Sequence, residues 1–195
     1  MNPNDLWAKK RPFPDKGDDE KNNVCLAVGQ ALSAWELFES SCTCSIFAMI
    51  MAPGNYSHAA RRAYGTIVSF KGRAEMLGEV AEIYFASEGE KYKEGLATAM
   101  KLAGRAAAVR NNIAHGLAMP FSTVKSYEQK QGWVLIPSWY STNKRDLDDN
   151  PSYIYTSKEI NDFTLGFESL GSHFRDFFSH LQVTNMWARK SREHR

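Results

Sequence analysis

The hydrophobic residues of the chain recur at helical spacing over most of its length. Four segments carry an apolar stripe at three- and four-residue intervals, the pattern of an amphipathic α-helix. We expect these helices at about residues 18–50, 57–85, 87–114 and 156–181. A Pro-Gly pair at 53–54 should end the first helix, and Gly116 with Pro120 should end the third.

Between the third and fourth helices the pattern becomes typical of strands. Residues 121–127 alternate weakly between apolar and polar side chains, and residues 133–140 are aromatic and β-branched. Residues 129–132 can supply the turn of a hairpin, and a short strand is expected at 153–155 after a polar loop. The chain is therefore predicted to be an all-α four-helix bundle with a β-hairpin inserted at about 121–155.

The chain of 195 residues has room for one such domain. Residues 1–17 carry three prolines and no periodicity, so we expect an extended N-terminal arm. A single helical domain should then cover residues 18–185, and residues 186–195 form a basic tail.

Two predicted helices carry a charge on the stripe that should be buried. Glu39 lies eleven residues after Val28, about 20° away around the helix axis, and Arg110 lies eighteen residues after Tyr92, at about the same angle. An isolated buried charge costs several kcal/mol, so each charge needs a partner. We predict a contact between Glu39 and Arg110, serving either as a core ion pair or as part of a functional site.

Arg110 opens the segment R-N-N-I-A-H-G, which ends at Gly116. Asn111 and His115 are four residues apart and share a helix face, so the amide can orient the imidazole. Arg110 and His115 are five residues apart and diverge by about 140° on an ideal helix. A histidine that only caps the helix end, where free carbonyls favour the imidazolium, is the alternative interpretation.

This segment resembles the R-x4-6-H motif of the HEPN superfamily. Members are small helical bundle proteins, and many are metal-independent ribonucleases of toxin–antitoxin, phage-defence and RNA-processing systems. The resemblance covers about residues 18–185, and Glu39 resembles the acidic residue often found near the site. The tyrosine that closely follows the histidine in nucleotidyl-modified toxin members is absent, since Gly116 and Leu117 stand there.

The resemblance implies cleavage of RNA by attack of its own 2′-hydroxyl on the adjacent phosphate. His115 would be the acid/base and Arg110 would stabilise the phosphate, with Asn111 and Glu39 in support. It also implies a homodimer in whose cleft two motifs meet, RNA as ligand, and an antitoxin or regulatory protein as a further partner.

Two other readings of the sequence stay open. The chain could be a non-catalytic HEPN-like module for dimerisation or regulation, or a helical bundle that binds a nucleotide or another small ligand. Neither reading requires His115 to act on RNA, so this histidine discriminates between them and the ribonuclease.

The distribution of charge favours an anionic ligand. Lys and Arg number 24 against 22 Asp and Glu, a net charge of +2 that argues against a binder driven by charge alone. Residues 95–127 and 40–74 nevertheless contain no acid. Within them we expect Lys101, Arg105, Lys71 and Arg73 to contact phosphates, although a solvated helix face would look the same.

Other features predict no additional chemistry. Cys42 and Cys44 are two residues apart on a helix, which suits burial and not a metal site. No histidine has the spacing of a di-metal bundle site, and no phosphate-binding glycine loop occurs, so neither metal nor cofactor is expected. With no apolar segment of membrane-spanning length and no secretion signal, we expect no contact with membranes and a cytoplasmic location.

Overall fold

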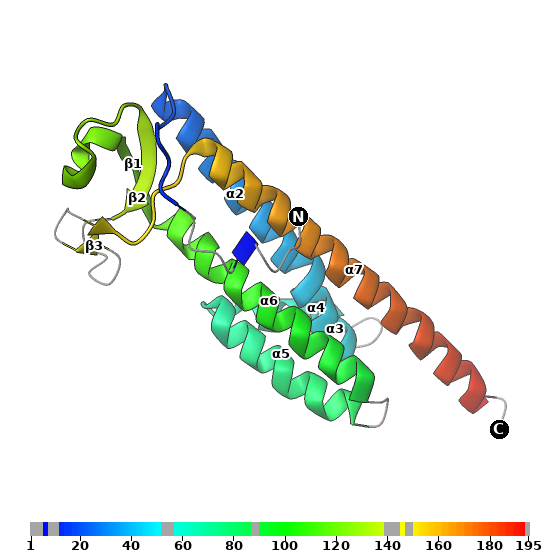
Figure 1. Ribbon diagram of the computed structural model, residues 1–195. Coiled ribbons are helices and arrows are strands. Elements are labelled where there is room, and N and C mark those ends of the chain that lie inside the picture. Colours follow the sequence, from blue (N-terminus) through cyan, green and yellow to red (C-terminus); the bar gives the residue numbers. More distant parts are fainter. Residues whose placement is uncertain are drawn as a thin grey trace. The chain divides into compact units, whose positions relative to one another are not determined.

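The computed structural model describes residues 6–7, 12–51, 57–86, 90–138, 145–146 and 150–193. These residues are mostly helical, with a small antiparallel hairpin (Figure 1). The chain divides into two compact units, each built from separate stretches of sequence. The first unit contains Met1–Glu36 and Arg105–Glu168, and the second contains Leu37–Gly104 and Ser169–Arg195. The predicted helical class is confirmed.

The first predicted helix is a continuous helical segment with a wider turn in its middle. It consists of α2 (Lys21–Phe38), the π-helical turn η1 (Glu39–Thr43) and α3 (Cys44–Met51). The carbonyl of Glu39 accepts the N–H of Cys44, five residues later, and also the Thr43 hydroxyl at 3.0 Å. Single π-turns of this kind are frequent at functional sites. The turn lies at the residue whose charge interrupts the apolar stripe.

The second predicted helix is two helices, so its expected continuity is wrong. The structure has α4 (Ser57–Gly65) and α5 (Phe70–Phe85), separated by four residues. The break follows a glycine and contains three residues of low helix propensity, T-I-V. Ser69 then caps α5, because its side-chain oxygen accepts the N–H of Gly72 at 3.1 Å.

The third and fourth predicted helices are α6 (Glu90–Ala114) and α7 (Ser157–Glu193). The sequence T-S-K-E at residues 156–159 predicts a capping box at the start of α7, and the structure confirms it, because the Glu159 carboxylate accepts the N–H of Thr156 at 2.8 Å. Helix α7 continues through most of the expected tail, since neither glycine nor proline follows Gly171. The sequence S-E-G-E at residues 87–90 predicts a similar cap for α6, but Ser87 lies outside the described residues.

The hairpin is present, but its first strand lies earlier than predicted. Strand β1 (Gly116–Pro120) pairs with β2 (Trp133–Pro137) in an antiparallel register that places Ala118 opposite Leu135. The second strand was predicted correctly at its start. Residues 121–127 form two 3₁₀ turns, η2 (Phe121–Thr123) and η3 (Lys125–Tyr127), because their apolar side chains fold back onto the sheet. A further short pair, β3 (Arg145–Asp146) with β4 (Asn150–Pro151), lies in the expected polar loop.

The N-terminal residues pack onto the first unit. Leu6 is buried, and the Trp7 ring stacks on Phe163 and Phe167 of α7 at centroid distances of 5.9 and 5.3 Å. A Cβ at Gly166 would lie 2.2 Å from Leu6 Cδ2, so this packing needs the glycine. The described part of the predicted arm therefore contributes to the core of its unit.

Each unit has aromatic contacts of its own. In the first, Trp35 meets Phe167 edge to face at 5.4 Å, and a small cluster lies against the hairpin, formed by Phe121, Val124, Val134, Ile136 and Ile154. In the second, Phe38 meets Phe174 at 5.2 Å, and Phe47 contacts Tyr64 at 5.6 Å. These pairs connect elements that are distant in sequence.

Candidate functional site

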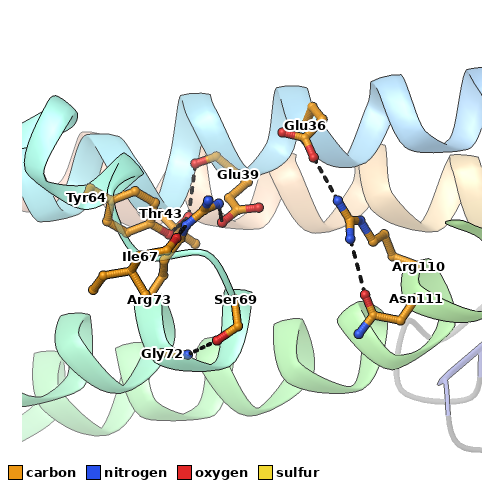
Figure 2. A network of polar contacts seen from close by, with 10 residues as sticks. All are labelled: Glu36, Glu39, Thr43, Tyr64, Ile67, Ser69, Gly72, Arg73, Arg110 and Asn111. Carbon is orange, nitrogen blue, oxygen red and sulfur yellow. Dashed lines mark hydrogen bonds and ion pairs between the residues drawn. The ribbon is translucent and has the colours of Figure 1, made fainter.

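Arg110 lies in the last turns of α6, where two groups hold its guanidinium (Figure 2). One terminal nitrogen donates to Asn111 Oδ1 at 3.2 Å, and the other donates to Glu36 Oε1 at 3.1 Å. The Arg110 side chain is 30% exposed and that of Glu36 is 62% exposed, so this ion pair is partly in water and weak. The Nε atom of Arg110 is buried without a hydrogen-bond partner among the described residues.

His115 is the first residue after α6 and is exposed. Its backbone N–H donates to the carbonyl of Asn111 at 3.1 Å, and strand β1 begins at the next residue, Gly116. A Cβ at Gly116 would lie 2.6 Å from Leu135 Cγ, so the glycine lets β2 pack directly against the helix end. The imidazole is therefore presented to solvent at a junction between a helix and a paired strand.

Asn111 binds a different group from the one predicted. Its side-chain oxygen accepts from Arg110, whereas the sequence suggested that it orients the His115 imidazole. The structure thus brings Arg110 and Asn111 together and leaves His115 exposed beside them in the chain.

Sequence reasoning missed three residues at this end of α6. The Tyr153 hydroxyl donates to the Asn112 carbonyl at 2.8 Å, and Asn112 Nδ2 donates to the Tyr155 hydroxyl at 3.3 Å. The only signal in the sequence was a pair of tyrosines at alternate positions of a short extended segment. That spacing predicts that the two tyrosines point to the same side of the segment, but it does not predict which residues they contact.

Glu39 lies in a separate polar cluster within the second unit (Figure 2). Its carboxylate contacts Arg73 Nη1 at 2.5 Å, with side chains only 6% and 20% exposed for Glu39 and Arg73. Arg73 Nε also donates to the Ile67 carbonyl at 2.6 Å, in the break between α4 and α5. The hydroxyls of Thr43 and Tyr64 share a hydrogen bond of 2.7 Å beside this pair. The predicted burial of Glu39 is confirmed.

The structure gives Glu39 and Arg110 each a partner other than the one predicted from the sequence. Glu39 pairs with Arg73, and Arg110 pairs with Glu36. The π-turn sets the position of Glu39, and the break between α4 and α5 sets that of Arg73. Neither irregularity was predicted from helical periodicity, so the partner could not be.

Burial also changes the acidity of nearby groups in the second unit. It raises the pKa of Tyr64, although the hydrogen bond that its hydroxyl shares with Thr43 works in the opposite direction. Burial likewise raises the pKa of the Cys42 and Cys44 thiols, so both are protonated at neutral pH. Both cysteines are buried, as predicted, and neither forms a disulfide.

The other predicted phosphate contacts divide between the units. Arg105 is exposed on the part of α6 that belongs to the first unit, and Lys101 is exposed on the part that belongs to the second. Lys71 is exposed and lies 3.7 Å from Glu75 in a surface ion pair. Arg73 is engaged inside its own unit, so a role in binding phosphate would require it to leave Glu39.

Within the described ranges, no group of three or more His, Cys, Asp or Glu side chains could hold a metal ion. Among the described residues, no helix is long and apolar enough to cross a membrane. No protein-family model, curated protein or solved structure matches this chain.

Proposed function

We propose that this chain is a HEPN-like, metal-independent endoribonuclease or RNA-binding protein. One observation supports the proposal most directly: a guanidinium held by Asn111 and an exposed imidazole occupy the same helix end, five residues apart. The residue types and their spacing are those of the R-x4-6-H motif. The proposal includes the four-helix bundle and the homodimer of that superfamily.

Arg110 has the character of a phosphate ligand. Its terminal nitrogens are oriented by Asn111 and by the carboxylate of Glu36, which is 62% exposed. A phosphate can replace an exposed carboxylate at little cost, because such surface pairs contribute about 0–1 kcal/mol. The guanidinium would then stabilise the charge that develops on the phosphorane-like transition state.

His115 supplies the proton transfer in this scheme. Attack of a ribose 2′-hydroxyl on the adjacent phosphate requires a base, and departure of the 5′-oxygen requires an acid. Imidazole performs both near neutral pH, and an exposed imidazole can reach RNA. In a homodimer each subunit could contribute a different group, which would accommodate the divergence of about 140° between Arg110 and His115 on an ideal helix.

The first prediction follows from this role of His115. The purified protein should cut single-stranded RNA in the presence of EDTA and leave a 2′,3′-cyclic phosphate end. The His115→Ala variant should lose at least about 10²-fold in cleavage rate, since general acid–base catalysis contributes 10²–10⁴-fold. Its melting temperature should stay close to that of the parent protein, because the side chain is exposed.

His173 provides a matched control. It is an exposed histidine on α7, and the His173→Ala variant should cleave RNA at the parent rate. Cleavage at the parent rate by the His115→Ala variant would exclude the proposed mechanism.

A non-catalytic dimerisation or regulatory module is the second candidate. It is favoured by the contacts of Arg110 to Glu36 and Asn111, which satisfy the charge without any ligand. In that case the protein would not cleave RNA, and Arg110→Ala would lower stability without any effect on RNA binding.

A further inference from the structure

Two tyrosines hold the end of α6 through a single residue, Asn112. The last four carbonyls of a helix have no partner inside the helix, and that of Asn112 is one of them. The Tyr153 hydroxyl donates to it at 2.8 Å, and Asn112 Nδ2 donates to the Tyr155 hydroxyl at 3.3 Å. Both the backbone and the side chain of one residue in the last turn are therefore restrained.

The two tyrosines are themselves firmly held. They are 4% and 9% exposed, and their rings stack at a centroid distance of 4.9 Å. Tyr155 exchanges backbone hydrogen bonds of 2.8 and 3.0 Å with Leu135 of β2, and its ring packs edge-on against Phe163 at 5.1 Å. Hydroxyls on such immobile rings can fix the groups that they bind.

The restrained residue stands inside the candidate motif. Asn112 follows Arg110 by two residues and precedes His115 by three. On the other side of His115, Gly116 is paired with Pro137 in the hairpin. His115 therefore lies between two anchored points, the clamped turn of α6 and the first residue pair of the β1–β2 sheet. A displacement of about 1 Å at a reacting group can cost about 10²-fold in rate.

We propose that Tyr153 and Tyr155 are positioning residues that keep Arg110 and His115 in the geometry in which they act. Their effect passes through Asn112, so neither tyrosine needs to touch RNA. The consequence for cleavage rests on the proposed function, whereas the restraint on the helix end is measurable without it.

The second prediction tests the restraint directly. Tyr153→Phe and Tyr155→Phe keep the stacked rings and remove only the hydroxyls. Loss of one hydrogen bond of about 1 kcal/mol should speed amide hydrogen exchange at residues 113–115 by about fivefold to tenfold in Tyr153→Phe. The NMR signals of the His115 imidazole should shift in both variants. Asn112→Ala keeps the backbone carbonyl that accepts from Tyr153 and removes only the side-chain bond to Tyr155, so it should reproduce the His115 shift of Tyr155→Phe.

Tyr127→Phe is the matched control. Tyr127 is a half-buried tyrosine of the same unit, and its ring contacts Phe13 and Phe121. This variant should leave exchange at residues 113–115 and the His115 signals unchanged. Equal exchange in all three tyrosine variants and the parent protein would overturn the proposal.

Measurements of kcat and KM distinguish a positioning role of the two tyrosines from a purely structural one. In Tyr153→Phe and Tyr155→Phe, kcat for RNA cleavage should fall by about tenfold or more while KM changes less than about twofold. Faster exchange with an unchanged kcat would mean that the tyrosines are only structural, and would overturn the positioning role. Absence of cleavage by the parent protein would instead refute the proposed ribonuclease activity. The hydrogen-exchange and His115 measurements would then test the restraint on the helix end by themselves.

Discussion

Glu39 is the residue whose charge most clearly contradicts its surroundings. It lies on an apolar stripe, is almost fully buried, and is balanced by Arg73, which is 20% exposed. Removal of one partner of a buried ion pair is far more costly than its presence is stabilising, because the remaining charge has lost its water. Its main role in the structure is therefore within the second unit, while the acidic supporting role implied by the family resemblance stays a prediction.

The third prediction concerns this pair. Glu39→Ala should lower the free energy of unfolding by about 3–5 kcal/mol, because the Arg73 guanidinium, which is largely shielded from water, loses the carboxylate that balances its charge. Urea denaturation measures the change. The double variant Glu39→Leu with Arg73→Met should recover most of the loss, since an apolar pair of similar volume needs no charge balance.

Lys71 and Glu75 supply the control for this prediction. Their side chains are 87% and 66% exposed and lie 3.7 Å apart. Lys71→Ala should change stability by at most about 1 kcal/mol, because water already screens the pair. A loss in Glu39→Ala no larger than this would show that the buried pair is not held as the structure has it.

At the scale of elements, the polar contacts that define both candidate clusters lie at irregular parts of the chain. The π-turn places Glu39, the break between α4 and α5 presents the Ile67 carbonyl, and the end of α6 presents Arg110 and His115. Regular helix satisfies its own backbone, so polar side chains find backbone partners where that regularity stops.

The hairpin shows the same dependence on one irregular residue. Gly132 has a φ of 93°, and a Cβ there would lie 2.6 Å from the backbone carbon of Gly17. This close approach lets Asp18 pair with Trp133 at the edge of β2, and the Asp18 carboxylate in turn accepts the N–H of Ser157 at 2.7 Å. The turn expected at residues 129–132 therefore also connects the hairpin to the start of α7.

The fourth prediction tests this junction. Gly132→Ala should lower the free energy of unfolding by about 2 kcal/mol or more, because alanine tolerates neither the positive φ nor the contact with backbone atoms. In contrast, Gly78→Ala should be neutral or stabilising by up to about 1 kcal/mol. Gly78 lies within α5 with no atom near its added Cβ. Chemical denaturation measures the stability change in both variants. Equal changes would contradict the close approach of Gly132 to the Gly17 backbone.

At the scale of the whole molecule, a buried phenol and two buried thiols make the free energy of unfolding depend on pH in the alkaline range. Burial raises the pKa of Tyr64, Cys42 and Cys44 in the folded protein. The unfolded chain loses these protons at ordinary values of 10.0 for tyrosine and 9.0 for cysteine. A raised folded pKa contributes stability that is fully present below the unfolded pKa and declines as the pH rises above it.

The fifth prediction follows from this sign. The free energy of unfolding should fall as the pH is raised above about 9, first through the thiols and then through Tyr64. Tyr64→Phe should make the fall less steep, and it should also lower stability at all pH values because the buried hydrogen bond between Tyr64 and Thr43 is lost. Urea denaturation at several pH values measures both the free energy of unfolding and how steeply it changes with pH. An unchanged slope would contradict the burial of the phenol.

The predictable part of the fold is the part that local sequence dictates. Helical periodicity predicted the helical class and the burial of Glu39. The aromatic and β-branched run predicted the start of β2, and the Thr156–Glu159 pair predicted the start of α7. The first strand was missed because G-L-A-M-P shows only the terminators of a helix, although it pairs along its full length with β2.

The sequence by itself determined which faces are apolar, where several helices begin, and that Arg110, Asn111 and His115 share one helix end. Periodicity reports that a face is buried, but it contains no information about what lies opposite. Only the tertiary structure decided that Glu39 pairs with Arg73, that Arg110 pairs with Glu36, and that two tyrosines hold Asn112. Hydrogen bonds and ion pairs need an approach within about 3 Å, which depends on turns and breaks far away in the chain.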